Sequence, residues 1–522
     1  MVAAGLTATA LGLAPAIPAA HALSVRSTRA VMTSFDGTPI VYNLFEPDDA
    51  SSSHPVPVIM RGHGWGGSGE RAGALSATSN TLLAADYAVL TWDARGFGDS
   101  GGSANFDDPN IEGKDASKLI DLLAARPEIA QNGPGDPVVG MSGGSYGGGI
   151  QLALAAFDHR VDAIAPEITW NDLRYSMYPH GVVKSGWDQI LYGDGLVYAS
   201  GDGVIEQTSP AGMQIGSYAP QVHEAEAVTT VLGTPSGDTL AYFAARSLAG
   251  YGIQHPVRVP TLLMQGSTDT LFNLNEAWAN YRAVAAAGAP VKLIAFCGGH
   301  IPCPSGYQDG GARTHLDQAI VTWFGKYLRH QATDTGAPVE YSTQDGAWHT
   351  IGAFPTSASP AGAIYVTAPV DDSALSTGAP TSPGISSVKD RNDIYLTDSP
   401  SLDLPDTATI PVFGATAATQ IVGIPHVDLT FMVAGNGAHL FFKLLDRESK
   451  QVLDVQAESF RLDGPTLGTV HLSFDLVGVT YLLAAGHHLD LQVSTNSWAH
   501  ESYRGAADVS FTGSVAVPTL GA

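Results

Sequence analysis

The sequence has few charged residues, and basic ones are the scarcer kind. Charged residues make up 14% of the 522 positions, with 25 Lys and Arg against 50 Asp and Glu, which gives a formal net charge of −25. An acidic field of this size repels phosphate backbones and anionic membranes. We therefore expect no nucleic-acid partner, and we interpret the acidity as a source of solubility.

Long apolar runs are missing as well. After the first residues no segment has 18 consecutive apolar residues, so we expect no membrane association in the mature protein. Residues 1–22 are uncharged, rich in Ala and Leu, and end in Ala20-His21-Ala22, which fits a signal-peptidase site. They lack the usual basic start, and an uncleaved anchor is the alternative, although Pro15 and Pro18 disfavour a spanning helix. We predict a signal peptide over 1–22 and a secreted, bacterial protein.

Cysteine is almost absent, which excludes a fold held together by many disulfides. The two cysteines, Cys297 and Cys303, lie close together in the sequence. In an exported protein such a pair predicts a disulfide, with two unpaired thiols as the alternative. Closing so short a loop contributes only about 2 kcal/mol in the loop-entropy model. Its larger effect would be to stiffen the turn that carries His300.

The chain is long enough for about three domains. From residue 28 to 165, short apolar segments alternate with helical stretches, which is typical of a parallel sheet covered on both faces. This pattern stops after Pro166 and resumes near residue 260. We predict a catalytic domain from 23–166 and 253–335, interrupted by a cap insertion at 167–252. The expected strands are Val56–Met60, Ala88–Trp92, Pro137–Met141, Pro260–Gln265 and Val291–Phe296, and the expected helices are Ala116–Ala125, Gly149–Phe157, Leu274–Ala287 and Arg313–His330.

The pattern changes again beyond residue 336. Apolar and other residues alternate over 427–433, and Asn436-Gly437 follows as a predicted hairpin turn before the alternation continues over 440–444. Similar alternation recurs over 472–476 and 489–493. We predict an antiparallel β-sandwich of the jelly-roll type over 336–522.

The strongest chemical signal is Gly143-Gly144-Ser145-Tyr146-Gly147, which lies between an apolar strand and a helical stretch. A Gly-x-Ser-x-Gly turn in this context is a nucleophile elbow, whose strained backbone needs small neighbours. The helix N-terminus that follows favours a developing anion. The sequence therefore predicts an α/β-hydrolase fold with Ser145 as nucleophile, against the alternative of a glycine-rich turn with an uninvolved serine.

A serine nucleophile needs a base and an acid that orients the base. Asp269 and His300 each follow an apolar strand, and they come after Ser145 in the chain order that this fold requires. We predict Asp269 as the acid and His300 as the base. Glu276 and His315 are the alternatives. Asp93 also ends a strand, but it precedes the nucleophile, so we assign it a structural role together with Arg95.

Two N–H groups should stabilise the tetrahedral intermediate. The sequence predicts the backbone N–H of Tyr146 as one donor and that of Trp65, in the loop His63-Gly64-Trp65-Gly66-Gly67, as the other. We interpret His63 as a loop-packing residue rather than a base or a metal ligand. No cluster with metal-ligand spacing and no phosphate-binding loop is present, so we expect no metal and no cofactor.

Aromatic residues are frequent in the insertion. Trp170, Tyr175 and Trp187, together with Trp65, could form the wall of a substrate pocket between the sheet and the insertion. Such residues form the insertion's own core at least as often.

Several motifs together resemble the X-prolyl dipeptidyl-peptidase and cocaine esterase family of serine hydrolases, from about residue 28 to the end. They are DARGFGDSGG at 93–102, the elbow segment at 138–173, QGSTDTLF at 265–272, GGH at 298–300, and the C-terminal sandwich. The resemblance implies a cap and a jelly-roll, and the family's serine, aspartate and histidine correspond to Ser145, Asp269 and His300. Many members place a tyrosine in the first oxyanion loop. Here that position reads Gly64-Trp65, so donation is expected from the backbone alone.

These observations favour a secreted serine hydrolase that cleaves an ester or amide through an acyl-enzyme on Ser145, with esters preferred and a small-molecule or peptide acyl substrate as its partner. An X-prolyl dipeptidyl peptidase is the first alternative, and it needs an acidic group that the sequence does not identify. The same acyl-enzyme also serves an acyltransferase. A non-catalytic binding protein is the alternative of another class, although Ser145, Asp269 and His300 in the expected order argue against it.

Overall fold

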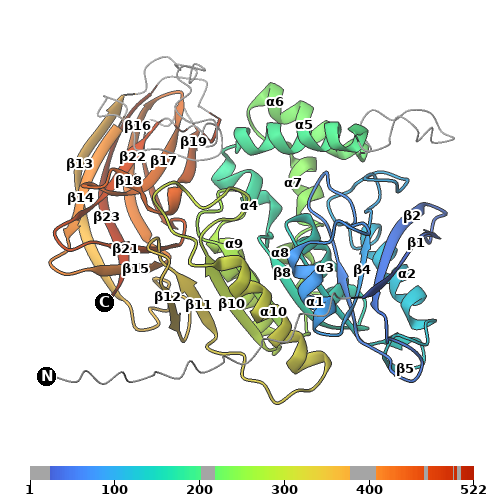
Figure 1. The fold of residues 1–522 in the computed structure, drawn as a ribbon. Coiled ribbons are helices and arrows are strands. Elements are labelled where there is room, and N and C mark those ends of the chain that lie inside the picture. Colours follow the sequence, from blue (N-terminus) through green and yellow to red (C-terminus); the bar gives the residue numbers. More distant parts are fainter. Residues whose placement is uncertain are drawn as a thin grey trace, which may run out of the picture.

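The computed structural model describes residues 24–201, 218–376, 407–463, 468–495, 497, 499–501 and 507–521. The predicted signal peptide at 1–22 lies outside these residues. The described chain forms an α/β domain, a group of helices above it, and a β-sandwich beside both (Figure 1). In these described ranges, no helix has both the length and the apolar character needed to cross a membrane.

A mixed sheet forms the centre of the α/β domain. Among the described residues it has ten strands in the order β1-β2-β4-β3-β7-β8-β9-β10-β11-β12, and all neighbours from β4 to β11 pair in parallel. The central strands β4, β9 and β10 are buried along almost their whole length because helices cover both faces of the sheet. The strands are β1 (Val25–Thr33), β2 (Pro39–Pro47), β3 (Val58–Arg61), β4 (Ala88–Trp92), β7 (Val139–Gly144), β8 (Val161–Glu167), β9 (Thr261–Gly266), β10 (Val291–Phe296), β11 (Val339–Ser342) and β12 (Trp348–Ile351).

Helices pack on both sides of this sheet, as the alternating pattern predicted. Three of them, α2 (Glu112–Ala124), α3 (Tyr146–Phe157) and α9 (Leu274–Ala286), share apolar clusters with one face. The other face is covered by α1 (Ala77–Ala84) and α10 (Ala312–Leu328). A small separate pair, β5 (Gln131–Gly133) and β6 (Asp136–Pro137), lies outside the main sheet. The predicted doubly wound α/β class is confirmed.

The insertion between β8 and β9 is helical, and its α5 and α6 lie above the sheet (Figure 1). Two aromatic residues of this insertion, Trp170 and Trp187, are almost fully buried. Its elements are α4 (Leu173–Met177), the 3₁₀ turn η1 (Pro179–Gly181), α5 (Ser185–Gly201), α6 (Pro220–Leu232), α7 (Gly237–Ala244) and α8 (Leu248–Tyr251).

The C-terminal part consists of two antiparallel sheets whose inner faces share one apolar core. One sheet contains β13 (Ile364–Ser376), β15 (Thr419–Gly423), β16 (His426–Gly435), β20 (Gly468–Asp475), β21 (Val479–Leu483) and β23 (Ala507–Gly521). The other contains β14 (Thr407–Gly414), β17 (Gly437–Asp446), β18 (Gln451–Val452), β19 (Glu458–Asp463) and β22 (His488–Ser494), and the 3₁₀ turn η2 (Leu453–Val455) precedes β19. The predicted all-β sandwich is confirmed.

One detail of the sequence interpretation is wrong. Asn436-Gly437 is not the turn of a hairpin, because β16 pairs with β20 and β23 whereas β17 pairs with β19, β18 and β22. The chain crosses there from one sheet to the other, and each strand contributes its apolar face to the shared core. The domain boundary at residue 336 stays a prediction, and two strands beyond it belong to the large sheet. β11 pairs in parallel with β10, so the large sheet extends to residue 351.

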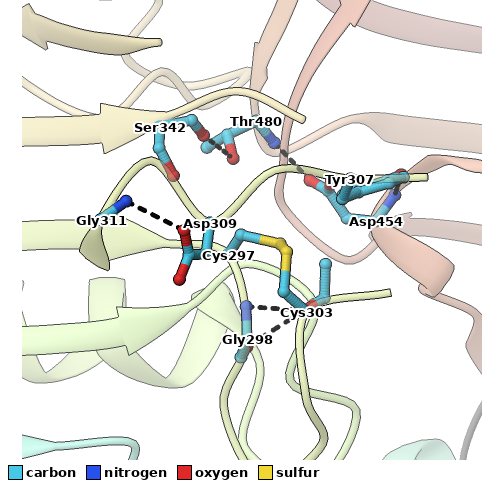
Figure 2. Close-up of a disulfide and its surroundings, with 10 residues drawn as sticks. Cys297, Gly298, Cys303, Tyr307, Asp309, Gly311, Ser342, Asp454 and Thr480 are labelled. Carbon is cyan, nitrogen blue, oxygen red and sulfur yellow. Dashed lines mark hydrogen bonds between the residues drawn. A yellow bond between two sulfur atoms is a disulfide. The ribbon is translucent and has the colours of Figure 1, made fainter. Parts of the chain in front are cut away.

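The sandwich and the α/β domain meet near the disulfide (Figure 2). The backbone N–H of Asp454 donates to the Tyr307 hydroxyl at 3.1 Å, and the Asp454 carboxylate accepts the N–H of Thr480 at 2.6 Å. The other carboxylate oxygen of Asp454 is buried without a hydrogen-bond partner. Burial raises the pKa of Asp454 to about 7, so this junction contains a carboxyl group that is easier to bury when it is protonated.

We expect the Asp454→Asn variant to change how stability depends on pH. The folded protein holds the Asp454 proton up to about pH 7, whereas the unfolded chain releases it near pH 4. The wild type should therefore lose stability as pH rises from 4 to 7, by an amount on the order of 4 kcal/mol. The asparagine cannot ionise and should remove most of this slope.

Urea unfolding at a series of pH values measures the effect, with the exposed Asp238→Asn as the matched control. Equal slopes in the Asp454→Asn variant and the wild type would contradict the assignment.

Candidate active site

Ser145 occupies the sharp turn between β7 and α3. Its backbone lies at φ 57° and ψ −120°, a strained region for a residue with a side chain. The turn is held by hydrogen bonds from the Ser145 N–H to the Glu167 carbonyl at 2.9 Å and from the Thr169 hydroxyl to the Ser145 carbonyl at 3.0 Å. Gly147 allows the neighbouring loop to approach, since a Cβ there would lie 2.3 Å from the carbonyl oxygen of Gly62.

His300 lies directly against the serine. Its Nε2 is 2.7 Å from the Ser145 Oγ, and its Nδ1 is 2.7 Å from Oδ2 of Asp269. An ionised carboxylate only accepts, so Nδ1 carries the proton and Nε2 is free to accept the serine proton. The three side chains therefore form one hydrogen-bonded line across the carboxyl ends of β7, β9 and β10.

Asp269 is completely buried, and five donors surround its carboxylate. Oδ1 accepts the backbone N–H groups of Leu271 and Phe272 at 3.0 and 3.1 Å. Oδ2 accepts, besides the imidazole, the backbone N–H of His300 at 3.2 Å and the Gln265 amide at 3.4 Å. These donors fix the direction of the carboxylate.

The loop that carries His300 is tied down on both sides. Cys297 and Cys303 form the predicted disulfide (Figure 2). The Thr268 hydroxyl accepts the N–H of Gly298 at 3.0 Å and lies 3.1 Å from its carbonyl, so the base loop is bonded to the acid loop. The disulfide prediction is confirmed.

The predicted oxyanion donors are the backbone N–H groups of Tyr146 and Trp65. Tyr146 is the first residue of α3, where N–H groups have no acceptor within the helix. The Gly64 carbonyl accepts the His63 Nδ1–H at 2.7 Å and the N–H of Gly67 at 2.9 Å. The Gly64 carbonyl and the Trp65 N–H belong to one peptide group, and in a trans peptide they point in opposite directions. The Trp65 N–H therefore points away from His63 and Gly67, which donate to that carbonyl.

His63 acts as a packing residue of this loop, as predicted. Its Nε2 accepts the backbone N–H of Ala94 at 2.9 Å, which places its proton on Nδ1. Burial lowers the pKa of His63 and favours the neutral ring that both bonds require. The Trp65 ring stacks on Phe106, with centroids 4.2 Å apart.

One of the three predicted pocket residues of the insertion reaches the catalytic line. The Trp187 ring lies edge-on to the His300 ring at 5.7 Å, and its Nε1 donates to the Thr270 hydroxyl at 3.0 Å. Trp170 instead contacts Phe272 at 5.3 Å and is buried behind it. The Tyr175 hydroxyl donates to Glu458 of the sandwich at 2.6 Å, so this side chain belongs to a domain junction.

The alternative acid and base lie elsewhere. Glu276 accepts the backbone N–H groups of Asn171 and Asp172, and burial raises its pKa to about 7. His315 bonds to Glu340 and stacks on Trp348. Neither is hydrogen-bonded to the catalytic line.

Asp93 and Arg95 have the structural roles that the sequence suggested. Asp93 accepts the backbone N–H groups of Gly69 and Asp99, at 2.7 and 2.8 Å. Arg95 pairs with the buried Asp115.

Sequence reasoning missed several residues around the site. Phe272 packs edge-on against His300 at 5.1 Å, and its position just after the acid was the available signal. Lys184 and Gln456 donate to backbone carbonyls of the acid loop. Lys184 is one of only three Lys and Arg residues in 167–252, a signal that could have been noticed. Gln456 has no comparable signal.

A pocket opens between the insertion and the oxyanion loop. Its empty volume is about 370 Å³, and its lining includes Trp65, Tyr192 and Phe243 together with the two acids Asp188 and Glu226. Burial and the neighbouring Glu226 raise the pKa of Asp188 to about 8. Asp188 is therefore largely protonated at neutral pH.

Two groups of carboxylates and imidazoles within the described chain have the proximity of metal ligands. They are Asp49, His54 and Asp86, and Asp446, Glu448 and His487. Neither contains a residue of the catalytic line.

A serine, an imidazole and a buried carboxylate at the carboxyl edge of a mostly parallel sheet define the class of serine hydrolases with the α/β-hydrolase fold. Comparison with known families narrows this class. The profile described as X-Pro dipeptidyl-peptidase (S15 family) matches residues 36–302, and that of the X-Pro dipeptidyl-peptidase C-terminal non-catalytic domain matches residues 331–466. The chain belongs to the S15 family and is a serine hydrolase. The resemblance inferred from its motifs is confirmed.

Solved structures have the same architecture over almost the whole chain. An α-amino acid ester hydrolase is 16% identical with a TM-score of 0.72, and the match covers 96% of this chain and 98% of that one. An aminopeptidase from a marine sediment Thaumarchaeota archaeon is 15% identical with a TM-score of 0.69, covering 95% and 97%. A CocE/NonD family hydrolase from Staphylococcus aureus is 15% identical with a TM-score of 0.65, covering 95% and 93%. At these identities the similarity shows the fold alone.

Among curated proteins, an uncharacterized 31.7 kDa protein of Escherichia coli is 29% identical over 128 residues. This match covers 24% of the present chain and 42% of the Escherichia coli protein, which is less than half of that relative.

Removing the disulfide should lower kcat by more than the accompanying loss of stability explains. We expect a Cys297→Ser, Cys303→Ser double variant to lose about 2 kcal/mol of unfolding free energy, the loop-entropy value. Its kcat for a short acyl ester should fall several-fold further than that of an equally destabilised control, because the loop that carries His300 becomes free to move. Urea unfolding and ester kinetics measure the two effects. A double variant with wild-type kcat would show that the disulfide does not orient the base.

Proposed function

We propose that the protein is a carboxylic ester hydrolase that works through an acyl-enzyme on Ser145. The observation that carries this proposal is the line of two 2.7 Å contacts from Ser145 through His300 to Asp269. The strained backbone of Ser145 supports it, because strain of this kind is retained where function requires it.

In the first step, the Ser145 oxygen attacks the ester carbonyl while its proton moves to His300 Nε2. The carbonyl π electrons go to oxygen, and the N–H groups of Tyr146 and Trp65 stabilise that anion. The intermediate then expels the alcohol, which takes the proton from His300, and the acyl group stays on Ser145. In the second step, water attacks the acyl-enzyme in the same way and releases the acid. Asp269 remains ionised and stabilises the imidazolium.

The acyl group lies next to Trp187 and Phe272 in this proposal. Both rings contact His300 edge-on, so the base has an apolar wall on the side of the cap. Excluding water there strengthens the hydrogen bonds that act on the developing charge.

The Ser145→Ala variant tests the nucleophile directly. We expect hydrolysis of p-nitrophenyl acetate and butyrate to fall by at least about 10⁴-fold, and labelling by a fluorophosphonate probe to disappear. The melting temperature should stay nearly unchanged, because alanine keeps the Cβ and the backbone conformation of the turn. The exposed Ser357→Ala is the matched control. Turnover in Ser145→Ala close to that of the wild type would refute the assignment.

An X-prolyl dipeptidyl peptidase is the second candidate, and one observation favours it. Such an enzyme must hold the free amine of its substrate, and Asp188 and Glu226 supply a half-buried acidic pair in an aromatic pocket. Acidic side chains among aromatic rings suit an ammonium group. Asp188 directly follows Trp187 in α5, so the pocket lies close to the catalytic line.

Neutralising this pair separates the two candidates. If the pocket holds an amine, the Asp188→Asn, Glu226→Gln double variant should raise the KM for an Ala-Pro-p-nitroanilide about tenfold, or about 1.4 kcal/mol. The kcat/KM for p-nitrophenyl acetate, which has no amine, should stay the same. The matched control is Glu224→Gln, an exposed residue on α6, the helix that also carries Glu226. Failure of the wild type to cleave the anilide would remove the peptidase from consideration.

We also propose that the protein is exported. The disulfide between Cys297 and Cys303 supports this, because such bonds persist mainly in oxidising compartments.

A further inference from the structure

The loop that carries the acid is held from outside by side chains of two other parts of the molecule. Nζ of Lys184, in the insertion, donates to the carbonyls of Thr270 and Leu271 at 2.8 and 3.0 Å. Nε2 of Gln456, in the sandwich, donates to the carbonyls of Ser267 and Asp269, both at 2.9 Å. Four carbonyls of this short loop are therefore bound by donors from distant segments.

The two carbonyls bound by Lys184 belong to the peptide groups that contact the Asp269 carboxylate. The Thr270 carbonyl shares its peptide group with the Leu271 N–H, and the Leu271 carbonyl shares its own with the Phe272 N–H. Both N–H groups donate to Oδ1 of Asp269. Each peptide group is trans, so a donor that fixes its carbonyl also fixes the opposite direction of its N–H. Lys184 thus lies at the far end of two short chains of hydrogen bonds that end on the acid.

The surroundings of Lys184 support a role of this kind. Its side chain is 4% exposed, and it forms no ion pair with the described residues. The charged groups that face it are Glu458 of the sandwich, Glu276 of α9 and Asp269 itself. Burial lowers its pKa to about 8, so it is mostly protonated at neutral pH. A buried cation is costly, and one without a paired carboxylate needs the carbonyls that it binds.

Gln456 brings the sandwich into the same arrangement. It follows the turn η2, whose Asp454 contacts Tyr307 in the segment beyond His300 (Figure 2). One short segment of the domain described as non-catalytic therefore touches the acid loop and the chain beyond the base.

We infer that Lys184 and Gln456 are positioning residues of the catalytic machinery, which hold the peptide groups of the Asp269 loop and thereby the direction of its carboxylate. Lys184 acts through the peptides before Leu271 and Phe272, and its charge polarises both toward the acid. Gln456 holds the two peptides at the start of the loop. This inference rests on the proposed function, since it assigns Asp269 as the orienting acid.

The Lys184→Met variant is the main test, because methionine keeps the length and apolar stem but removes the donors and the charge. We expect kcat for p-nitrophenyl acetate to fall about 10²-fold with KM nearly unchanged, since the acid is misaligned while the acyl pocket is intact. The low-field ¹H NMR signal of the His300 Nδ1–H should shift or broaden. Lys184→Gln, which keeps an N–H donor without the charge, should recover part of the loss.

Lys292→Met is the matched control. Lys292 is also buried, at 5% exposed, and donates to Glu340 at an edge of the sheet rather than to the acid loop. The Lys292→Met variant shows how far kcat falls when a buried lysine is lost away from the acid loop. An equal kcat in Lys184→Met and Lys292→Met, with an unchanged low-field signal in both, would overturn the inference.

Gln456→Leu tests the positioning role of Gln456. It takes the place of Lys184→Met as the main test if Lys184→Met does not fold. We expect a kcat loss with an unchanged KM and a perturbed low-field signal, and a wild-type kcat and signal would overturn the part of the inference that concerns the sandwich. The two hypotheses fail differently. Ser145→Ala with full activity refutes the proposed function, whereas an inactive Ser145→Ala beside a fully active Lys184→Met refutes only the positioning role.

Discussion

The hydrogen bond from His300 to Asp269 is the interaction on which the site depends. It requires an ionised carboxylate where no water reaches it, and Asp269 is fully buried. Burying an isolated charge costs several kcal/mol, so the carboxylate persists only because fixed donors surround it. Two of these are backbone N–H groups of its own loop, and a third is the backbone N–H of His300. The conformation of this loop is therefore part of the catalytic machinery.

Ser145 is constrained through its backbone, whereas Asp269 is constrained through its buried carboxylate. The Ser145 backbone adopts a region that costs about 1–3 kcal/mol for a residue with a side chain. Two hydrogen bonds hold this strained conformation. The Ser145 N–H donates to the Glu167 carbonyl on β8, and the Thr169 hydroxyl donates to the Ser145 carbonyl. Gly147 lets the loop that begins at Gly62 approach the elbow closely, because a Cβ there would lie 2.3 Å from the Gly62 carbonyl oxygen. The order of the parallel strands places this turn beside the loops after β9 and β10.

The insertion and the sandwich complete this arrangement rather than simply covering it. Trp187 places an apolar ring against the base, and Tyr175 joins the insertion to Glu458 of the sandwich. The contacts of Asp454 and Gln456 join the sandwich to the segments after β9 and β10. Several buried carboxyl groups at these junctions have raised pKa values, Asp454 and Glu276 among them. The three parts are thus coupled by polar contacts in a dry interior, where hydrogen bonds are strong and unpaired groups are costly.

The sequence by itself determined the elements whose signals are local. The elbow around Ser145, the loops of Asp269 and His300, the alternating strands and helices, and the close cysteine pair all follow from periodicity, turn chemistry and chain order. Only the tertiary structure decided that β16 and β17 lie in different sheets, because a hairpin and a crossing connection share the same local pattern. It also decided that Trp187 rather than Tyr175 faces the base, and that Lys184 and Gln456 meet the acid loop from opposite parts of the chain. Side-chain periodicity encodes which face of an element is buried, whereas the partner across that face is set by packing between segments far apart in sequence.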